Sequence, residues 1–214
     1  MVKLIVYGNS IATCTQRVLI LLEELQLKYT LQEVDLLNGE QKDPKFLFLQ
    51  PFGKVPSVRY DNDILFESRA ILRYIAKNNN DDTDLTLNDS VYVDIWLEAE
   101  SQNFNPAVSK FVYEKIFKKW FNKDAEINET ILQESITELE HVFSVYEKRL
   151  EKSKYLGGDS FSIADISHIP YLFLFVNAGS EYKQILKKYP FVYKWYKKLI
   201  SRESVKTILH NQSN

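Results

Sequence analysis

The stretch from residue 50 to residue 70, QPFGKVPSVRYDNDILFESRA, constrains the fold of this chain more than any other. A turn at residues 51–53 precedes residues 57–60, whose alternating side chains predict a strand. Pro56 stands at the entrance of that strand, where it removes one backbone donor. Only an X–Pro bond adopts the cis form at low cost, and a cis Pro56 would leave the backbone N–H and C=O of Val55 free to pair with a ligand. The stretch therefore predicts a strand edge that can hold an extended, peptide-like molecule.

The second half of this stretch predicts a second anchor. Residues 61–63 form a tight turn into a short apolar strand at residues 64–66, and a helix is predicted to follow from Arg69 to Lys77. Ser68 is the predicted N-cap of that helix. A helix start offers unpaired N–H groups and the positive end of the helix dipole, which together suit a carboxylate. We therefore expect a helix N-terminus for the acidic end of the ligand, close to the strand edge that holds its body.

Two motifs in this stretch resemble a known family. PFGKVP followed by LFESRAI resembles the pattern of glutathione transferases, most closely the phi type and its related fungal branch, although Gln50 stands where that family usually has asparagine. The resemblance covers nearly the whole chain. It implies the glutathione transferase fold, in which an α/β thioredoxin-like N-terminal domain precedes an all-α C-terminal domain. It also implies glutathione as the co-substrate, no other cofactor, and a homodimer with Arg69 and the helix after Ser68 in its interface.

The composition narrows the class of protein further. The chain has 214 residues, of which 45% are hydrophobic and 14% aromatic, and this is ample for a packed core. A net charge of −2 gives no general attraction to nucleic acid or to an acidic membrane surface, so we expect neither as a partner. The apolar start is too short for a signal-peptide core and Cys14 is the only cysteine, so we predict a cytoplasmic protein without an internal disulfide. The three histidines lack the spacing of metal ligands, and no metal is expected.

The spacing of apolar residues predicts the order of elements in the N-terminal part. Residues 3–7 form a near-continuous apolar run, as in a strand buried on both faces. Residues 13–26 change to the three-and-four spacing of an amphipathic helix and residues 28–36 alternate again, so the two strands of this βαβ unit should be parallel. A short helix is expected after Asp43. With the elements of residues 50–77, the order becomes β-α-β-α-β-β-α, which is the thioredoxin-like arrangement.

Residues 78–84 are polar and have no periodicity, and the sequence patterns before and after them differ. Beyond them nearly every segment has the period of a helix. We predict residues 1–77 as the thioredoxin-like, glutathione-binding domain and residues 78–88 as a linker. Residues 89–214 are predicted to form an all-helical domain that carries the electrophile site.

A capping box is predicted within the helical domain. Ser162 and Asp165 have the spacing at which two side chains satisfy the first N–H groups of a helix, and Phe161 and Ile166 can form the accompanying hydrophobic staple. Glutathione transferases carry this S-x-x-D box at the same place. We therefore expect the box to fix the start of a central, buried helix and to have no catalytic role.

The resemblance implies one chemical task, which is to hold glutathione and to lower the pKa of its thiol. A free thiol has a pKa of about 8.5, and helix N-terminal dipoles and hydrogen-bond donors favour the thiolate. Phi-type enzymes supply a serine hydroxyl at the start of the first helix, but this chain has Ala12 at that position. Three replacements are open: the hydroxyl of Thr13, which we favour, the hydroxyl of Ser10, or a backbone N–H alone. Cys14 is an alternative nucleophile, although its side chain is expected to turn toward the core or the other domain.

The same resemblance assigns the residues that would hold glutathione. Gln41 and Lys42 match the histidine and lysine of a family run that approaches the glycine carboxylate, and Lys54 replaces a glutamine as a point charge for the same group. Val55 would pair with the cysteinyl backbone across the proline that follows it. Glu67 would meet the γ-glutamyl amine, and the serine after it would meet the γ-glutamyl carboxylate. The predicted glutathione-binding residues are Gln41, Lys42, Lys54, Val55, Pro56, Glu67 and Ser68.

The electrophile is expected to lie against the helical domain. The residues predicted for its site share small, apolar or aromatic side chains, and they are Ile11, Ala12, Phe111, Phe117 and Trp120. An aromatic stripe at helical spacing is equally typical of a core, so that interpretation stays open for each aromatic residue. Lysines interleave with aromatic residues here and again at residues 193–198, and with a balanced charge both segments are predicted to be solvated faces.

The predicted function is a glutathione transferase that conjugates glutathione to small apolar electrophiles or reduces organic hydroperoxides. Two alternatives stay open. Ala12 favours a non-catalytic glutathione- or ligand-binding protein that kept the fold after losing the serine, whereas Cys14 would serve a cysteine-based thiol transferase. The two catalytic hypotheses separate by substitution, because Cys14→Ser should abolish only the cysteine-dependent activity and Thr13→Ala only conjugation.

Overall fold

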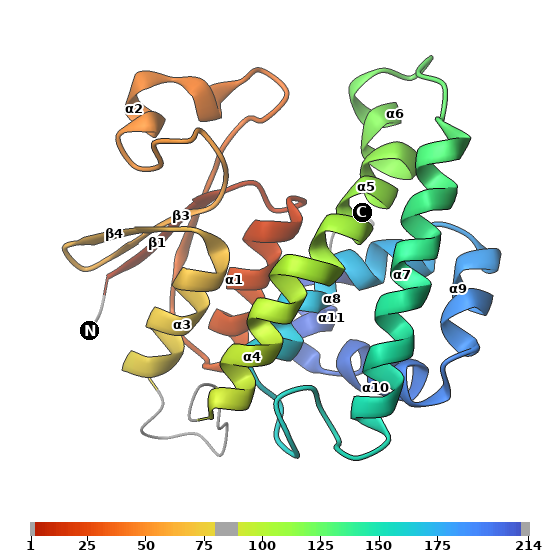
Figure 1. Ribbon diagram of the computed structural model, residues 1–214. Coiled ribbons are helices and arrows are strands. Elements are labelled where there is room, and N and C mark those ends of the chain that lie inside the picture. Colours follow the sequence, from red (N-terminus) through yellow and green to blue (C-terminus); the bar gives the residue numbers. More distant parts are fainter. Residues whose placement is uncertain (1–2, 80–89, 211–214) are drawn as a thin grey trace. The chain divides into compact units, whose positions relative to one another are not determined.

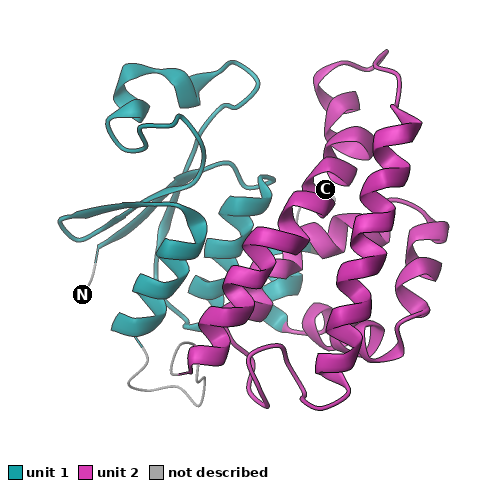
Figure 2. Ribbon diagram, in the orientation of Figure 1, with its two compact units in different colours: residues 1–84, 203–214 teal, residues 85–202 magenta. Residues whose placement is uncertain are grey.

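The computed structural model describes residues 3–79 and 90–210. Two compact units are present (Figure 2): the first joins residues 1–84 to residues 203–214, and the second comprises residues 85–202. The four strands of the described chain belong to the first unit, and the second unit is helical. Within the same described ranges, no helix is long and apolar enough to cross a membrane.

The first unit is built on a four-stranded sheet. Its elements are β1 (Leu4–Gly8), α1 (Thr13–Glu24), β2 (Thr30–Glu33), the 3-10 helix η1 (Glu40–Lys42), α2 (Pro44–Leu47), β3 (Ser57–Tyr60), β4 (Asp63–Phe66), α3 (Ser68–Asn78) and α11 (Glu203–His210). The strand order is β2-β1-β3-β4, in which β1 pairs parallel with β2 and antiparallel with β3, and β3 pairs antiparallel with β4. The predicted parallel βαβ unit and the thioredoxin-like arrangement are confirmed.

Apolar side chains of the strands and helices form the core of the first unit. Leu4 and Val6 of β1 are buried, as the near-continuous apolar run predicts for a central strand. Leu21 of α1 and Ile71 of α3 are also completely buried, and these two helices pack on each other. Figure 1 shows α1 and α3 side by side, with α2 across the strands from them. This frame brings the starts of α1 and α3 into contact through their side chains.

The last described helix, α11, belongs to the first unit rather than to the helical residues that precede it. It packs on α1, and the hydroxyl of Ser204 donates a hydrogen bond to the carboxylate of Glu24. Val205 and Leu209 are buried in this unit. The predicted helical domain, residues 89–214, therefore differs from the structure at its C-terminal end, because spacing along a helix does not reveal which distant helix it packs on. Residues 80–88 of the predicted linker lie outside the described residues.

The second unit consists of helices, and two of those described are short π-helices. Its elements are α4 (Val91–Ala99), the π-helix η2 (Glu100–Phe104), α5 (Asn105–Val112), the π-helix η3 (Tyr113–Phe117), α6 (Lys118–Phe121), α7 (Glu129–Leu150), α8 (Ile163–Asn177), α9 (Ser180–Lys187) and α10 (Pro190–Ile200). The run from α4 to α6 is continuous, which explains why the sequence period persists across it. α7 packs on α5, and α8 packs on α4, α5 and α10.

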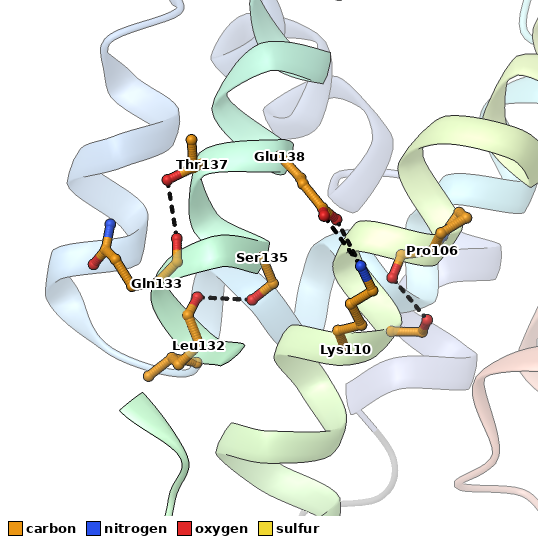
Figure 3. A network of polar contacts seen from close by, with 8 residues as sticks. Pro106, Lys110, Leu132, Gln133, Ser135, Thr137 and Glu138 are labelled. Atoms are coloured by element: carbon orange, nitrogen blue, oxygen red, sulfur yellow. Dashed lines mark hydrogen bonds and ion pairs between the residues drawn. The ribbon is translucent and has the colours of Figure 1, made fainter. Parts of the chain in front are cut away.

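Polar contacts reinforce the packing of α5 on α7 at the surface (Figure 3). The ammonium group of Lys110 lies 3.1 Å from the Glu138 carboxylate, and both side chains are about half exposed. Nearby hydroxyls bond backbone within their own helices, as Ser135 does to the carbonyl of Leu132 at 2.7 Å. An exposed ion pair of this kind contributes about 1 kcal/mol or less, so the packing rests on the apolar side chains beneath it.

The predicted capping box is present at the start of α8. The backbone N–H of Ser162 donates to the Asp165 carboxylate at 3.0 Å, and Asp165 is completely buried. Three further donors reach this carboxylate: the hydroxyl of Ser162 at 3.1 Å, the backbone N–H of Leu156 at 3.1 Å and the indole Nε1 of Trp195 at 2.8 Å. Burial raises the pKa of Asp165 to about 6, although the hydrogen bonds from Trp195, Leu156 and Ser162 oppose the rise. Asp165 thus joins three segments of the second unit.

Candidate functional site

The entrance of β3 has the predicted geometry. The peptide bond between Val55 and Pro56 is cis. The pairing of β3 with β1 begins at Ser57, which lies opposite Tyr7, so Val55 precedes the paired part of the strand. The hydroxyl of Ser57 donates to the carbonyls of Leu49 and Leu65, at 3.1 and 3.0 Å. A side chain at the first position of β3 thus holds the entrance in place.

The turn before this entrance is held by the buried side chain of Gln50. Its Oε1 accepts the backbone N–H of Phe52 at 2.7 Å and that of Lys54 at 3.2 Å. Gln50 is only 2% exposed, so water does not compete for these bonds. The glutamine that stands in place of the expected asparagine therefore has a structural task, because its amide closes the turn that positions Lys54 and Val55.

Gly53 brings the segment of residues 41–42 against the turn. Its φ of +60° lies in the left-handed region, and a Cβ there would be 2.7 Å from the carbonyl oxygen of Gln41 and 2.8 Å from Nζ of Lys42. Lys42 Nζ donates to the carbonyl of Phe52 at 3.1 Å. Oε1 of Gln41 is buried and has no hydrogen-bond partner among the described residues. The structure thus places Gln41 and Lys42 beside residues 52–54, as the resemblance implies for a carboxylate site.

The start of α3 differs from the prediction. Ser68 is the first helical residue, and the N-cap is Glu67, which provides no side-chain cap. The predicted N-cap was wrong because Glu67 itself makes the bend, with φ 64° and ψ 106°, and the helix begins one residue early. Such a backbone costs a residue other than glycine about 1–3 kcal/mol and clusters at ligand sites. Glu67 and Ser68, which the resemblance assigns to the γ-glutamyl group, thus lie on a strained bend that leads into a helix.

Arg17 is a site residue that the sequence interpretation missed. Its side chain is completely buried, and Nη1 donates to Oγ of Ser68 at 3.4 Å and to Sγ of Cys14 at 3.5 Å. A buried charge is tolerated only where polar partners surround it. The available signal was its place on α1, four residues before the buried Leu21 and so on the same face. Arg17 puts positive charge between the start of α1 and the start of α3.

The loop that leads into α1 is tied to β2 and ends without a side-chain cap. The N-cap is Ala12, which forms no side-chain hydrogen bond to the helix. The backbone N–H of Ser10 donates to the Glu33 carboxylate at 3.2 Å, and Nδ2 of Asn9 donates to the carbonyl of Val34 at 3.2 Å. The first-turn N–H groups of α1 consequently have no hydroxyl from the N-cap residue to satisfy them.

The three candidate residues for thiol chemistry, Thr13, Ser10 and Cys14, differ in their burial and in the charged groups beside them. Thr13 is the first residue of α1 and is only 4% exposed. Ser10 is half-buried in the loop, beside the negative charge of Glu33. Cys14 is half-buried and contacts Arg17 one helical turn further along α1. The choice of donor remains a prediction, but the Glu33 carboxylate beside Ser10 disfavours an anion near that hydroxyl.

One residue of the predicted electrophile site belongs to the core instead. Phe111 is completely buried in the second unit, where its ring lies 4.8 Å from that of Phe175 and 4.7 Å from that of Tyr182. It cannot line a cleft, because its ring is enclosed by other aromatic rings. Phe117 and Trp120 form a separate pair with ring centroids 5.0 Å apart, and Trp120 is half exposed. Ile11, at 45% exposure, and the half-buried Ala12 lie at the start of α1.

The residues around this region do not form a metal site. Among residues 3–79 and 90–210, no cluster of three or more His, Cys, Asp or Glu side chains could hold a metal ion.

Two family models match most of the chain. The model described as "Glutathione S-transferase, N-terminal domain" matches residues 2–77, and the model described as "Glutathione S-transferase, C-terminal domain" matches residues 104–203. Glutathione S-transferase 1 of Triticum aestivum is 37% identical over 212 residues, covering 95% of this chain and 92% of its own. A glutathione S-transferase of Silene vulgaris is 36% identical, covering 93% of each chain.

Solved structures of plant proteins have the same architecture. Glutathione transferase F7 of Populus trichocarpa superposes with a TM-score of 0.91 at 33% identity, covering 99% of this chain and 100% of that one. Glutathione S-transferase I of maize, solved in complex with an atrazine glutathione conjugate, has a TM-score of 0.87 at 30% identity and covers 99% and 100%. Both units of this chain therefore have counterparts in these proteins.

Proposed function

Because the chain belongs to the glutathione S-transferase family, we propose that it transfers glutathione to small apolar electrophiles, in the manner of the phi-type proteins that it resembles. The glutathione thiolate attacks an electrophilic carbon, a C–S bond forms, and the leaving group departs with the bonding electrons. The maize protein of the same architecture was solved with a conjugate of this chemical kind. In this reaction glutathione is the co-substrate, and we propose no other cofactor.

The observation that carries this proposal is the pair of backbone anchors in the first unit. Val55, before the paired part of β3, offers its backbone to the cysteinyl residue of glutathione, and the start of α3 at Ser68 offers N–H groups to the γ-glutamyl carboxylate. The buried, unpartnered Oε1 of Gln41 marks a third polar point, and the ammonium of Lys42 lies at the neighbouring turn, where it donates to the carbonyl of Phe52. Together these groups suit an extended tripeptide with a carboxylate at each end.

Activation of the thiol is assigned to the start of α1. The positive end of the helix dipole and the guanidinium of Arg17 both favour a thiolate there. The Glu33 carboxylate beside Ser10 opposes one, so we assign the donor hydroxyl to Thr13. The same thiolate can attack a peroxide oxygen, releasing an alcohol and a glutathione sulfenic acid, which a second glutathione converts to the disulfide and water. Reduction of organic hydroperoxides thus needs no additional residue.

Conjugation of glutathione to chlorodinitrobenzene tests this function. We expect turnover by the wild type, and a KM for glutathione at least about tenfold higher in Ser68→Ala, because a hydrogen bond to a charged group is worth about 1.5–3 kcal/mol. Ser109→Ala is the matched control, since its hydroxyl bonds only the carbonyl of Pro106 in the second unit. An unchanged KM in Ser68→Ala, with the same fold by circular dichroism, would remove Ser68 from the site.

Two observations keep the alternatives in view. Ala12 lacks the hydroxyl of the family serine, which favours a binding protein, and a wild type that binds glutathione without turnover would support it. The guanidinium of Arg17 beside the Cys14 sulfur favours a cysteine-based thiol transferase. In that case Cys14→Ser removes reduction of glutathione mixed disulfides, and Thr13→Ala leaves it intact.

A homodimer and a cytoplasmic location complete the proposal. Val91, Tyr92 and Ile95 of α4 are at least half exposed, and such apolar side chains are typical of a surface that a second copy covers. Arg69 and α3 remain the part of the first unit that is predicted to lie in the dimer interface. The lone Cys14 fits a reducing compartment. Ile95→Lys should shift the molar mass measured by light scattering from the dimer to the monomer, and an unchanged mass would exclude α4 from the interface.

A further inference from the structure

The second unit contains a cavity of about 310 Å³ that the proposed function does not use. Its walls come from the end of α7, the loop at residues 151–159 and one face of α10. Leu150 and Phe191 contribute apolar surface, and the volume falls in the range of small-molecule sites. No residue of the candidate functional site belongs to its walls.

The face of α10 that lines the cavity alternates aromatic and cationic side chains. Phe191, Lys194, Trp195 and Lys198 follow the three-and-four spacing of a single helix face, and all four line the cavity. The indole of Trp195 is fixed, because its Nε1 donates to the buried Asp165. The segment that the sequence predicts as a solvated face is therefore divided: Lys194 and Lys198 line a concave surface, and Lys197 does not.

The charges around the cavity leave an excess of cations. Four lysines line it, at positions 152, 154, 194 and 198, against the carboxylates of Glu151 and Asp159. Within residues 3–79 and 90–210 none of these lysines forms an ion pair. Lys198 lies 4.6 Å above the ring of Tyr155, and Asp159 accepts the backbone N–H of Lys154 at 3.3 Å. Lysines without a carboxylate partner among the described residues, beside the apolar side chains of Leu150 and Phe191, suit a ligand with both a negative charge and a ring.

The cavity is preformed because its loop is internally bonded. Nε of Arg149 donates to the carbonyl of Leu156 at 2.9 Å, and the hydroxyl of Ser153 donates to the carbonyl of Tyr155 at 2.8 Å. The backbone N–H of Tyr155 donates to the carbonyl of Gly158 at 2.8 Å. A wall that is already ordered loses little conformational entropy when a ligand binds.

We propose that this cavity binds a small aromatic carboxylate or sulfonate. The ring of the ligand packs on Leu150 and Phe191, and its acid group is neutralised by Lys194 and Lys198. The N-terminus of α10 does not supply the charge, because Glu147 already accepts the backbone N–H groups of Phe191 and Val192 at 3.0 and 2.9 Å. The proposed site shares no residue with the candidate functional site.

Calorimetric titration with naphthalene sulfonate tests the proposal, with S-hexylglutathione present in excess to occupy the glutathione site. We expect saturable binding to the wild type and a Kd at least about tenfold higher for the double variant Lys194→Met and Lys198→Met, since two partly exposed charge contacts together are worth about 1.4 kcal/mol. Lys197→Met is the matched control on the same helix, and its Kd should stay within about twofold of the wild type. Naphthylmethanol, a neutral analogue, should bind the wild type about tenfold more weakly than the sulfonate.

Two results would overturn the proposal. One is the absence of wild-type binding at millimolar sulfonate, and the other is an equal Kd for the double variant and the Lys197→Met control. Conjugation of chlorodinitrobenzene should be unchanged in all these variants, because none of the substituted lysines belongs to the predicted glutathione site or the predicted electrophile site. Calorimetric titration therefore tests the sulfonate site, and the conjugation assay separately tests the transferase assignment.

Discussion

At the scale of single residues, the proposed chemistry depends on the side chains at the start of α1. Ala12 has no side-chain hydroxyl at the expected position, the Glu33 carboxylate lies beside Ser10, and the guanidinium of Arg17 lies beside Cys14, the residue after Thr13. Electrostatic environment, rather than the presence of a hydroxyl, then distinguishes the two donors, because a nearby positive charge stabilises the thiolate and a nearby negative charge opposes it. On this account Thr13 replaces the family serine.

Gly53 offers a test of how the glutathione site is held together. Gly53→Ala should lower the free energy of unfolding by about 2 kcal/mol or more, since alanine resists a left-handed φ and its Cβ would meet the carbonyl of Gln41. The same clash displaces residues 41–42, so glutathione binding should weaken as well. Gly39→Ala is the control, because Gly39 has a φ of +79° with nothing within 4 Å of the added Cβ. If urea unfolding finds the two variants equally destabilised, the close packing at Gly53 is not what holds the turn.

At the scale of elements, α8 is fixed by one buried carboxylate. We predict that Asp165→Ala lowers the free energy of unfolding by about 2–4 kcal/mol, beyond the cost of about 0.5–2 kcal/mol for a cap alone, because the indole of Trp195 and the N–H of Leu156 lose their acceptor. The KM for glutathione should be nearly unchanged, since the change lies in the second unit. A variant of full stability that loses glutathione affinity would contradict a purely structural role.

The same carboxylate gives a pH dependence of known sign. Burial raises the pKa of Asp165 from 3.8 to about 6, so the folded state holds its proton over a range where the unfolded chain has released it. The stabilisation that comes from this difference in pKa is fully present below pH 3.8. It is lost as the pH rises to about 6, which lowers the free energy of unfolding by about 3 kcal/mol in total. Asp165→Asn cannot ionise. The stability of the wild type relative to this variant should therefore fall across that interval in urea unfolding at several pH values, and a constant difference would show that the carboxylate is ionised throughout.

At the scale of the whole molecule, the sequence predicted features that depend on neighbouring residues better than contacts between segments far apart in the chain. The parallel βαβ unit, the β-α-β-α-β-β-α order of strands and α-helices and the capping box all follow from short-range spacing, and the structure confirms them while adding the unpredicted 3-10 helix η1. Packing between distant segments was not predictable: α11 joins the first unit, and Phe111 enters an aromatic core instead of a cleft. The strained bend at Glu67 was missed because glutamate has no preference for a positive φ, so its sequence carried no signal of the early helix start.

The apparent pKa of glutathione bound to the protein tests the central claim most directly, and the ultraviolet absorbance of the thiolate across pH measures it. The account predicts a wild-type pKa well below the value of about 8.5 for a free thiol, and a rise toward that value in Thr13→Ala. Ser10→Ala and Thr137→Ala should match the wild type, since Thr137 lies on α7 and bonds the carbonyl of Gln133. A rise in Ser10→Ala alone would move the donor to the loop. Bound glutathione that titrates like the free thiol would contradict the enzyme assignment and mark Ala12 as the trace of a lost active site.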